Sequence, residues 1–188
     1  NATVLRPFVI PEKKEKYILY QGAVNLGRCF EYLIPAMQSV QGKLLIIGKG
    51  NYFDQTKALI EKYGVGDKVE MLGYKRPQEL IAYTEQAWVG ITLFDIANDG
   101  KSNQFSMANR FFDYMHSGVP QLCMNYPEYQ KVNEQYELAV LIGKPEPAMI
   151  ATALNRILQD DVFHLKLQQN AMMAREVYCW QEEEKSLL

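Results

Sequence analysis

Apolar segments of strand length alternate with amphipathic segments of helical length along most of the chain. The segment from Trp88 to Phe94 (WVGITLF) is continuously apolar, which favours a strand buried on both faces of a parallel sheet. Strands are predicted at residues 17–22, 43–48, 68–73, 88–94, 119–124 and 138–143. Their alternation with helices predicts an α/β fold: a doubly wound, Rossmann-like parallel sheet of about six strands, with helices on both faces.

Helical patterns fill the spaces between the predicted strands. Helices are predicted at residues 28–40, 53–63 and 77–87, the second stopping at Gly64 and the third beginning with Pro77 at a first-turn position. Residues 126–137 read as an amphipathic connection of loop and helix, and a C-terminal helical tail is predicted from about Pro147. Trp180 is expected to anchor the end of this tail by burial.

The first 16 residues differ from the rest because they are irregular and carry two prolines and a charge run, EKKEK. We therefore predict an interdomain linker at residues 1–16 and one domain at residues 17–188. The sequence opens on Asn1 rather than Met. We expect a longer protein whose N-terminal domain lies outside this sequence.

Composition narrows the class of protein. Of the 188 residues 48% are hydrophobic and 22% charged, and the net charge of -2 gives no electrostatic footprint for nucleic acid. No apolar run approaches the roughly 20 residues that span a bilayer, and the first ten residues do not resemble a signal peptide. Three scattered cysteines without metal-ligand spacing are predicted to be buried, reduced thiols of a cytosolic protein: Cys29, Cys123 and Cys179.

The stretch SNQFSMANRFFDYMHSGVP, residues 102–120, holds the first candidate chemistry. It follows the strand at residues 88–94, so it lies at the carboxyl edge of the sheet, where ligands of doubly wound folds bind. In a helix, Asn109 and Asp113 share one face, whereas Phe112 and Met115 can pack on the sheet. The start of this helix offers free N–H groups and partial positive charge to a phosphate.

Arg110 and Asp113 allow two interpretations. Arg110 can neutralise a pyrophosphate while Asp113 accepts hydrogen bonds from a sugar diol, or both can belong to a solvated helix face with an ion pair. The loop QGAVNLGRCF, residues 21–30, also allows two interpretations. Its glycines let the backbone approach a phosphate that Arg28 grips, or it is a flexible turn with a surface arginine. The turn GKGNYF, residues 48–53, is more typical of a structural βα turn than of a dinucleotide site.

Three stretches together resemble the C-terminal, donor-binding domain of retaining GT-B glycosyltransferases of family 4, the glycosyl transferases group 1. YQGAVNLGRCFEYLIPAM resembles the family's first strand, glycine-rich loop and helix start. SNQFSMANRFFDYMHSGVPQL resembles its Pro-Asn-Lys-like triplet before Phe-Glu-Tyr-Met, Gly and Val-Pro. YCWQEEEKSLL is similar to its terminal segment. The similarity covers nearly the whole chain after Tyr17 and implies one half of a GT-B fold.

The resemblance also implies roles for residues. Arg28 and Arg110 match cations near the donor diphosphate, and they are the expected catalytic pair. Asp113 matches the acid that binds the ribose diol, one methylene shorter than the usual Glu. The segment from Gly73 through Tyr74 to Lys75 is expected near the base, and the loop at residues 95–104 near the donor sugar. The donor-binding set is Gly22, Asn25, Gly27, Arg28, Gly73, Tyr74, Lys75, Asn103, Ser106, Asn109, Arg110 and Asp113.

The sequence departs from the family pattern at two points. Phe105 stands where many members have the first of two glutamates, so Asn103 and Ser106 are expected to supply the contacts to the sugar ring. No lysine follows Arg28 closely, so Arg28 and Arg110 are expected to share that charge between them.

The expected function is transfer of a glycosyl group from a nucleoside diphosphate sugar to an acceptor hydroxyl, without metal or cofactor. The acceptor, a saccharide or lipid-linked sugar of polysaccharide biosynthesis, is expected on the missing N-terminal domain. This chain alone is therefore expected to bind nucleotide but transfer no sugar. A cytoplasmic location is expected, with peripheral membrane association of the full-length protein left open.

Two other functions stay open. A sugar-nucleotide 2-epimerase has a related architecture but needs carboxylates and histidines around the sugar, and only His116 lies near the site. A non-enzymatic flavodoxin-like module is the other alternative. A phosphoacceptor of that kind needs Asp at the end of the first strand, where this chain has Gln21 and Gly22.

Overall fold

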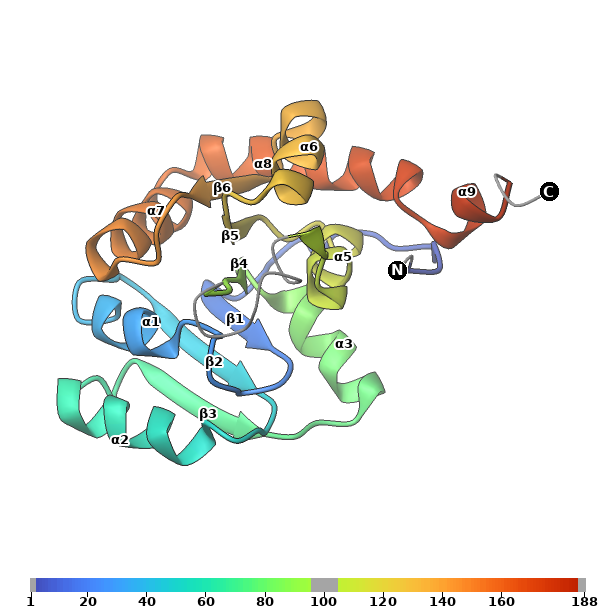
Figure 1. Ribbon diagram of the computed structural model, residues 1–188. Coiled ribbons are helices and arrows are strands. Elements are labelled where there is room, and N and C mark those ends of the chain that lie inside the picture. The colour runs from blue at the N-terminus through green and yellow to red at the C-terminus, as the bar shows by residue number, and fades with distance from the viewer. Residues whose placement is uncertain (1–2, 96–104, 186–188) are drawn as a thin grey trace.

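The computed structural model describes residues 3–95 and 105–185 and contains one parallel six-stranded sheet (Figure 1). The strand order is β3-β2-β1-β4-β5-β6, so the order reverses beside β1, as in a doubly wound fold. The strands are β1 (Tyr17–Gln21), β2 (Lys43–Ile47), β3 (Val69–Gly73), β4 (Val89–Thr92), β5 (Gln121–Met124) and β6 (Ala139–Ile142). Each strand lies within its predicted segment, and the predicted fold class is confirmed.

The helices follow the predicted pattern with a few differences in length. They are α1 (Phe30–Ala36), α2 (Phe53–Tyr63), α3 (Pro77–Gln86), α5 (Asn109–His116), α6 (Pro127–Tyr136), α7 (Pro147–Gln159), α8 (Asp161–Val177) and α9 (Trp180–Lys185). Helix α1 is shorter than predicted. It begins only after Cys29, whose φ of 62° is left-handed, and it ends just after Pro35.

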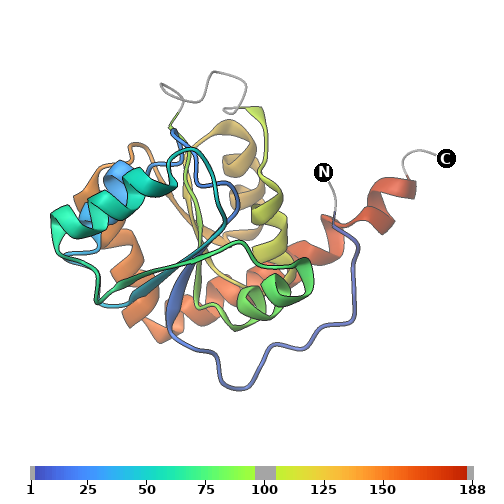
Figure 2. The ribbon, with the colours of Figure 1, turned by 90° about the horizontal axis from the view of Figure 1, so that it is seen from below.

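Two helical layers enclose the sheet. Figure 2 shows α1, α2 and α7 on one side and α3 and α5 on the other, with α8 crossing near the amino edge of the sheet. Strand β1 is buried on both faces, with Ile18 and Tyr20 in the larger apolar cluster and Tyr17 and Leu19 in the smaller one under α3 and α5. This alternation explains why the strands read as continuous apolar runs.

Helix α5 lies close to the sheet. A Cβ at Gly90 in β4 would be 2.5 Å from the ring of Tyr114, so only glycine leaves room for this ring. The Tyr114 hydroxyl donates to the carbonyl of Leu19 (2.8 Å). Phe112 and Met115 are buried, as predicted for the sheet-facing side of this helix. These contacts fix α5 against the middle of β1 and the start of β4.

The segment at residues 3–16 runs beside α8, and its start is joined to the C-terminal helices (Figure 2). Thr3 pairs with Cys179, and the N–H of Trp180 donates to the carbonyl of Thr3 (2.9 Å). The expected burial of Trp180 is wrong because its side chain is 46% exposed and the backbone provides the anchor instead. The division into linker and domain at residue 16 stays a prediction. All three cysteines are buried and free, as predicted.

Candidate functional site

The loops that follow β1 and β2 pack against each other at the carboxyl edge of the sheet. Gly48 has a φ of 147°, and a Cβ here would lie 1.8 Å from the carbonyl oxygen of Gly22. The N–H of Val24 donates to the carbonyl of Lys49 (3.1 Å), which joins the two loops. The approach is so close that only glycine fits at position 48. This geometry supports the structural interpretation of the turn at residues 48–53.

Asn25 and Asn51 clamp the same two loops. The side-chain oxygen of Asn25 accepts from the N–H of Asn51 (3.0 Å), and that of Asn51 accepts from the N–H of Leu26 (3.2 Å). Asn25, predicted as a donor-binding residue, thus has an evident structural role. Its contact with a ligand stays a prediction.

Arg110, the second residue of α5, is buried, with only 8% of its surface exposed. Its Nη1 donates to the carbonyl of Gln21 (3.1 Å) and to the hydroxyl of Tyr20 (3.4 Å). Its Nε and Nη2 are buried and have no hydrogen-bond partner among residues 3–95 and 105–185. The alternative of a solvated helix face is therefore wrong for Arg110. It costs free energy to bury a cation whose N–H donors have no acceptor. An anion that accepts hydrogen bonds from these donors removes this cost.

A second guanidinium lies beside Arg110. The Cζ atoms of Arg110 and Arg28 lie 4.8 Å and 4.7 Å from the centroid of the same ring, Phe94, which follows β4. A Cβ at Gly22 would lie 2.7 Å from Nη1 of Arg110, so glycine at the end of β1 makes room for this side chain. The carbonyl of Gly27 accepts from the N–H of Asp95 (2.9 Å), which ties the arginine-bearing loop to β4.

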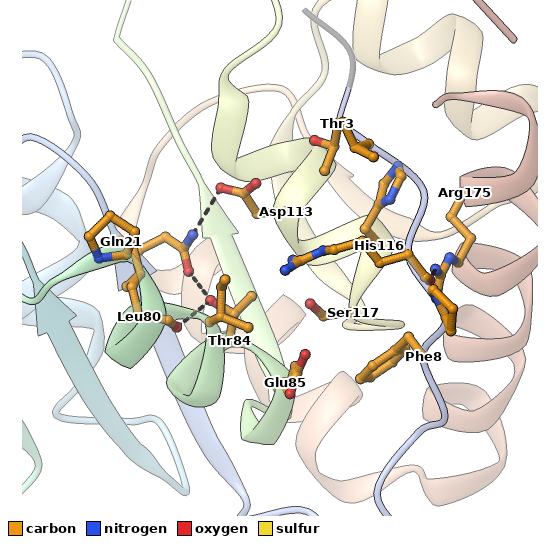
Figure 3. A pocket seen from close by; sticks show the side chains of 15 residues that line it. Thr3, Phe8, Gln21, Leu80, Thr84, Glu85, Asp113, His116, Ser117 and Arg175 are labelled. Atoms are coloured by element: carbon orange, nitrogen blue, oxygen red, sulfur yellow. Dashed lines mark hydrogen bonds between the residues drawn. The ribbon is translucent and has the colours of Figure 1, made fainter. Parts of the chain in front are cut away.

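Asp113 lies one turn after Arg110 on α5 and is half-buried. Its Oδ2 accepts from Nε2 of Gln21 (3.1 Å), and Oε1 of Gln21 accepts from the hydroxyl of Thr84 on α3 (2.7 Å), as Figure 3 shows. Burial raises the pKa of Asp113, whereas the hydrogen bond from Gln21 and the charges of Arg6 and Arg110 act in the opposite direction. Asp113 thus has a partner for one carboxylate oxygen.

Asp113 and Gln21 also line a pocket of about 320 Å³ between the N-terminal segment, α3, α5 and α8 (Figure 3). Its wall combines apolar side chains such as Phe8 and Leu80 with polar ones. His116 faces the pocket, but its Nε2 contacts the carbonyl of Tyr178 (2.9 Å), and burial lowers its pKa. The lining residues are Thr3, Val4, Arg6, Pro7, Phe8, Gln21, Pro77, Leu80, Ile81, Thr84, Glu85, Asp113, His116, Ser117 and Arg175.

The structure thus brings Gly22, Arg28, Arg110 and Asp113 together at one edge of the sheet. The remaining predicted residues that are described lie in loops or at element ends. Gly73 ends β3 with a φ of 68°, Tyr74 is 68% exposed, and Lys75 is half-buried, while Ser106 and Asn109 are exposed around the start of α5. Asn103 and most of the loop at residues 95–104 lie outside the described residues. Their contacts stay predictions.

Four residues of the candidate site are not predicted from the sequence: Gln21, Thr84, Tyr20 and Phe94. Gln21 offered a signal, since it is a polar residue at the end of an apolar strand in a doubly wound fold. Thr84 and Phe94 read as ordinary helix and strand residues, and their role depends on which strands are neighbours.

Neither a metal-binding cluster nor a membrane-spanning helix occurs within residues 3–95 and 105–185. No group of three or more His, Cys, Asp or Glu side chains there could hold a metal ion. No helix in these ranges combines the length and the apolar character needed to cross a membrane.

Comparison with known proteins identifies the family. The model of the glycosyl transferases group 1 matches residues 4–173, and the chain belongs to this family. An uncharacterized glycosyltransferase of Methanocaldococcus jannaschii is 25% identical over 171 residues, which are 88% of this chain and 42% of the relative. The chain thus spans about two fifths of the length of this relative.

Solved structures show the same fold. S. aureus TarM, in complex with fondaparinux, alpha-GlcNAc-glycerol and UDP, matches with a TM-score of 0.77 at 15% identity, over 98% of this chain and 37% of that one. Sucrose-phosphate synthase of Thermosynechococcus elongatus matches with a TM-score of 0.76 at 20% identity, over 92% of this chain and 44% of that one. The chain corresponds to the C-terminal half of GT-B glycosyltransferases, as the sequence predicts.

Proposed function

We propose that this member of the glycosyl transferases group 1 binds the nucleoside diphosphate of a sugar donor at the carboxyl edge of its sheet. The observation that carries the proposal is Arg110, a buried guanidinium whose Nε and Nη2 find no hydrogen-bond acceptor in the part of the chain that the structure describes. A diphosphate oxygen supplies the acceptors that these donors lack, and charge-assisted hydrogen bonds of this kind are among the stronger ones.

Arg28 and the start of α5 add to the same anion site. Arg28 contacts the ring of Phe94 that also contacts Arg110, so both cations lie against the same side chain. The first backbone N–H groups of α5, from Asn109, have no partner within the helix and favour negative charge. As the bond between the sugar and the diphosphate breaks, charge grows on the leaving group, and fixed cations stabilise it more than they stabilise the donor.

Asp113 is proposed to bind the ribose. A carboxylate accepts two O–H donors, which suits the vicinal hydroxyls of ribose. Its place one turn after Arg110 sets ribose and phosphate sites side by side on one helix. The base is proposed near Gly73, Tyr74 and Lys75, and the donor sugar near Asn103 and Ser106. The presence of UDP in the TarM structure makes UDP the first nucleotide to test.

For the full-length protein we propose retaining glycosyl transfer in the cytoplasm, with the acceptor held mainly by a further domain. The chain spans 42% of its relative, which is consistent with a donor-binding half. We expect this chain by itself to bind nucleotide without transferring sugar. Sugar transfer by the purified chain to a matched acceptor would contradict this expectation.

Calorimetric titration with UDP, GDP, ADP and CMP tests the donor site. We expect one diphosphate to bind, and Arg110→Ala and Asp113→Ala each to weaken it about 10- to 100-fold, the range of a lost charge-assisted hydrogen bond. Arg156→Ala is the matched control, because Arg156 is an exposed arginine on α7 that stacks on Phe163. Arg110→Gln serves if Arg110→Ala does not fold. A folded wild-type chain that binds none of the four nucleotides would overturn the proposal.

A further inference from the structure

A chain of three polar side chains, two of them buried, connects α3, β1 and α5 beneath the proposed ribose site. We propose that Gln21, oriented by Thr84, is a positioning residue that holds the carboxylate of Asp113 for the ribose diol. The inference rests on the proposed function and adds two residues that the family resemblance does not supply.

The geometry fixes the orientation of the Gln21 amide. Gln21 and Thr84 are each 3% exposed, so water does not compete for their polar groups. The Thr84 hydroxyl lies 2.7 Å from Oε1 of Gln21 and 2.8 Å from the carbonyl oxygen of Leu80 (Figure 3). It therefore donates its single proton toward one or both of these acceptors. With Oε1 toward Thr84, the amide nitrogen of Gln21 points at Asp113, which accepts at Oδ2 (3.1 Å).

The opposite amide orientation is unfavourable. It would place Oε1 of Gln21 against the ionised carboxylate of Asp113, so that two acceptors would face each other without a proton. The charge of Asp113 thus selects the orientation in which Oε1 of Gln21 accepts from the Thr84 hydroxyl. The bond from Gln21 occupies Oδ2 and leaves Oδ1, together with the remaining lone pair of Oδ2, for the two ribose hydroxyls.

A fixed carboxylate matters more here than in the usual family pattern. Asp113 is one methylene shorter than Glu, so it has less freedom to adjust its reach to the ribose. The other charges near Asp113 are Arg110 on its own helix and Arg6 on the N-terminal segment. Neither makes a hydrogen bond to Asp113 among the described residues, which leaves Gln21 as the group there that fixes the carboxylate by a direct bond.

Gln21 serves the phosphate side through its backbone and the ribose side through its side chain. Its carbonyl accepts from Nη1 of Arg110 (3.1 Å), and its N–H donates to the Tyr114 hydroxyl (3.2 Å). A substitution that changes only the side chain leaves both backbone bonds in place. The inference therefore predicts a loss confined to ribose recognition, which a general structural defect would not produce.

The experiment compares the affinity of the 188-residue chain for UDP with that for 2′,3′-dideoxy-UDP, with the GDP and ADP pairs titrated in parallel. Wild type should prefer the ribose form of its best diphosphate by about 10-fold or more, because the dideoxy form leaves Asp113 without donors. Gln21→Met should reduce this preference to about 3-fold or less while changing the dideoxy affinity less than about 2-fold. Thr84→Val, which replaces the hydroxyl by a methyl group, should reduce the preference in the same direction.

Thr56→Val is the matched control. Thr56 is also a buried helix threonine whose hydroxyl donates to the carbonyl four residues earlier, that of Tyr52 (2.7 Å), but it lies on α2 away from Asp113. It should keep the wild-type preference. The inference is overturned, and the proposed function is not, if both Gln21→Met and Thr84→Val keep the wild-type preference. The same holds if these variants lose equal affinity for the ribose and dideoxy forms. A wild-type chain that binds no diphosphate overturns the proposed function and this inference with it.

Discussion

At the amino edge of the sheet, two lysines close the ends of three helices. Nζ of Lys68 lies within 3.1 to 3.3 Å of three carbonyl oxygens in the turn after α1, and Nζ of Lys14 lies 3.2 Å and 3.4 Å from the carbonyl oxygens that end α5 and α3. Cations at helix C-termini also interact favourably with the helix dipole. At the carboxyl edge, Arg110 is buried to a similar degree as Lys14, but the described residues supply no partner for two of its nitrogens.

The two edges of the sheet thus differ in whether their buried charged groups have partners within the protein. Among the described residues, buried side-chain atoms without a hydrogen-bond partner occur in Glu31, Arg110 and Arg175. Glu31 lies in the first turn of α1 and Arg110 at the start of α5, both at the carboxyl edge, and Arg175 lines the adjoining pocket. Lys14 and Lys68 thus find acceptors within the protein where they support helix ends, whereas Arg110 at the carboxyl edge keeps two nitrogens for which the described residues supply no acceptor.

Gly48→Ala should have the largest effect, because it separates the two loops on which the carboxyl edge is built. The new Cβ would meet the carbonyl oxygen of Gly22 at 1.8 Å, and the φ of 147° is unfavourable for alanine. We expect a loss of about 3 to 5 kcal/mol in the free energy of unfolding, measured by urea denaturation. Gly64→Ala is the control, since Gly64 also has a positive φ but no atom near its Cβ position. It should cost only about 1 kcal/mol. Equal losses would show that the contact with Gly22 is unimportant.

Lys68→Met and Arg110→Met should separate stability from binding. Lys68→Met leaves three carbonyls without their donor and should lower the free energy of unfolding by about 2 kcal/mol, with nucleotide affinity unchanged. Arg110→Met should weaken nucleotide binding about 10- to 100-fold and change stability by less than about 1 kcal/mol, because it removes a charge that is only partly satisfied. Denaturation and titration of both variants give the comparison. The contrast between the two edges fails if each variant loses stability and affinity alike.

Lys14 should change how stability depends on pH and leave nucleotide affinity unchanged. Burial lowers its pKa from 10.5 to about 8, against the opposing charge of Glu85. Between these values the unfolded chain binds more protons at this site than the folded chain does. The wild-type free energy of unfolding should therefore rise with pH relative to Lys14→Met between about 8 and 10.5.

Denaturation at several pH values in this range measures that difference. Lys14→Arg is the control, because arginine stays charged throughout the range and should show no such rise. A wild-type curve parallel to that of Lys14→Met would mean that Lys14 is as solvated in the folded chain as in the unfolded one.

The sequence predicts the strands and most helices because burial on both faces of β1 and β4 leaves continuous apolar runs, and because Pro77 and Gly64 mark helix ends locally. It does not predict the state of Arg110. A charged residue in a helix usually faces solvent, and this one is buried because β1 and β4 are neighbours, which places Tyr20 and Phe94 on either side of it.

Gln21 and Trp180 also show what the sequence does not predict. Gln21 carried a signal at the end of a strand, but its partners on α3 and α5 are more than 60 residues away in sequence. Trp180 was expected to be buried from its residue type, yet the backbone pairing of Thr3 anchors the helix and leaves the indole half in solvent. A role that depends on side-chain partners from other helices and strands can be predicted only when the order of the strands is known.

The pairing of Thr3 with Cys179 also has a mechanical consequence. The two segments run parallel, and they are joined by the bond from Trp180 and by two bonds between the Gln181 amide and the backbone of Leu5. Opposed tension on the start of one segment and the end of the other loads these bonds in shear, so they share the force rather than break one after another. Tension would thus be carried along this clamp before it reaches the sheet, and the carboxyl edge would keep its shape while the two segments are pulled.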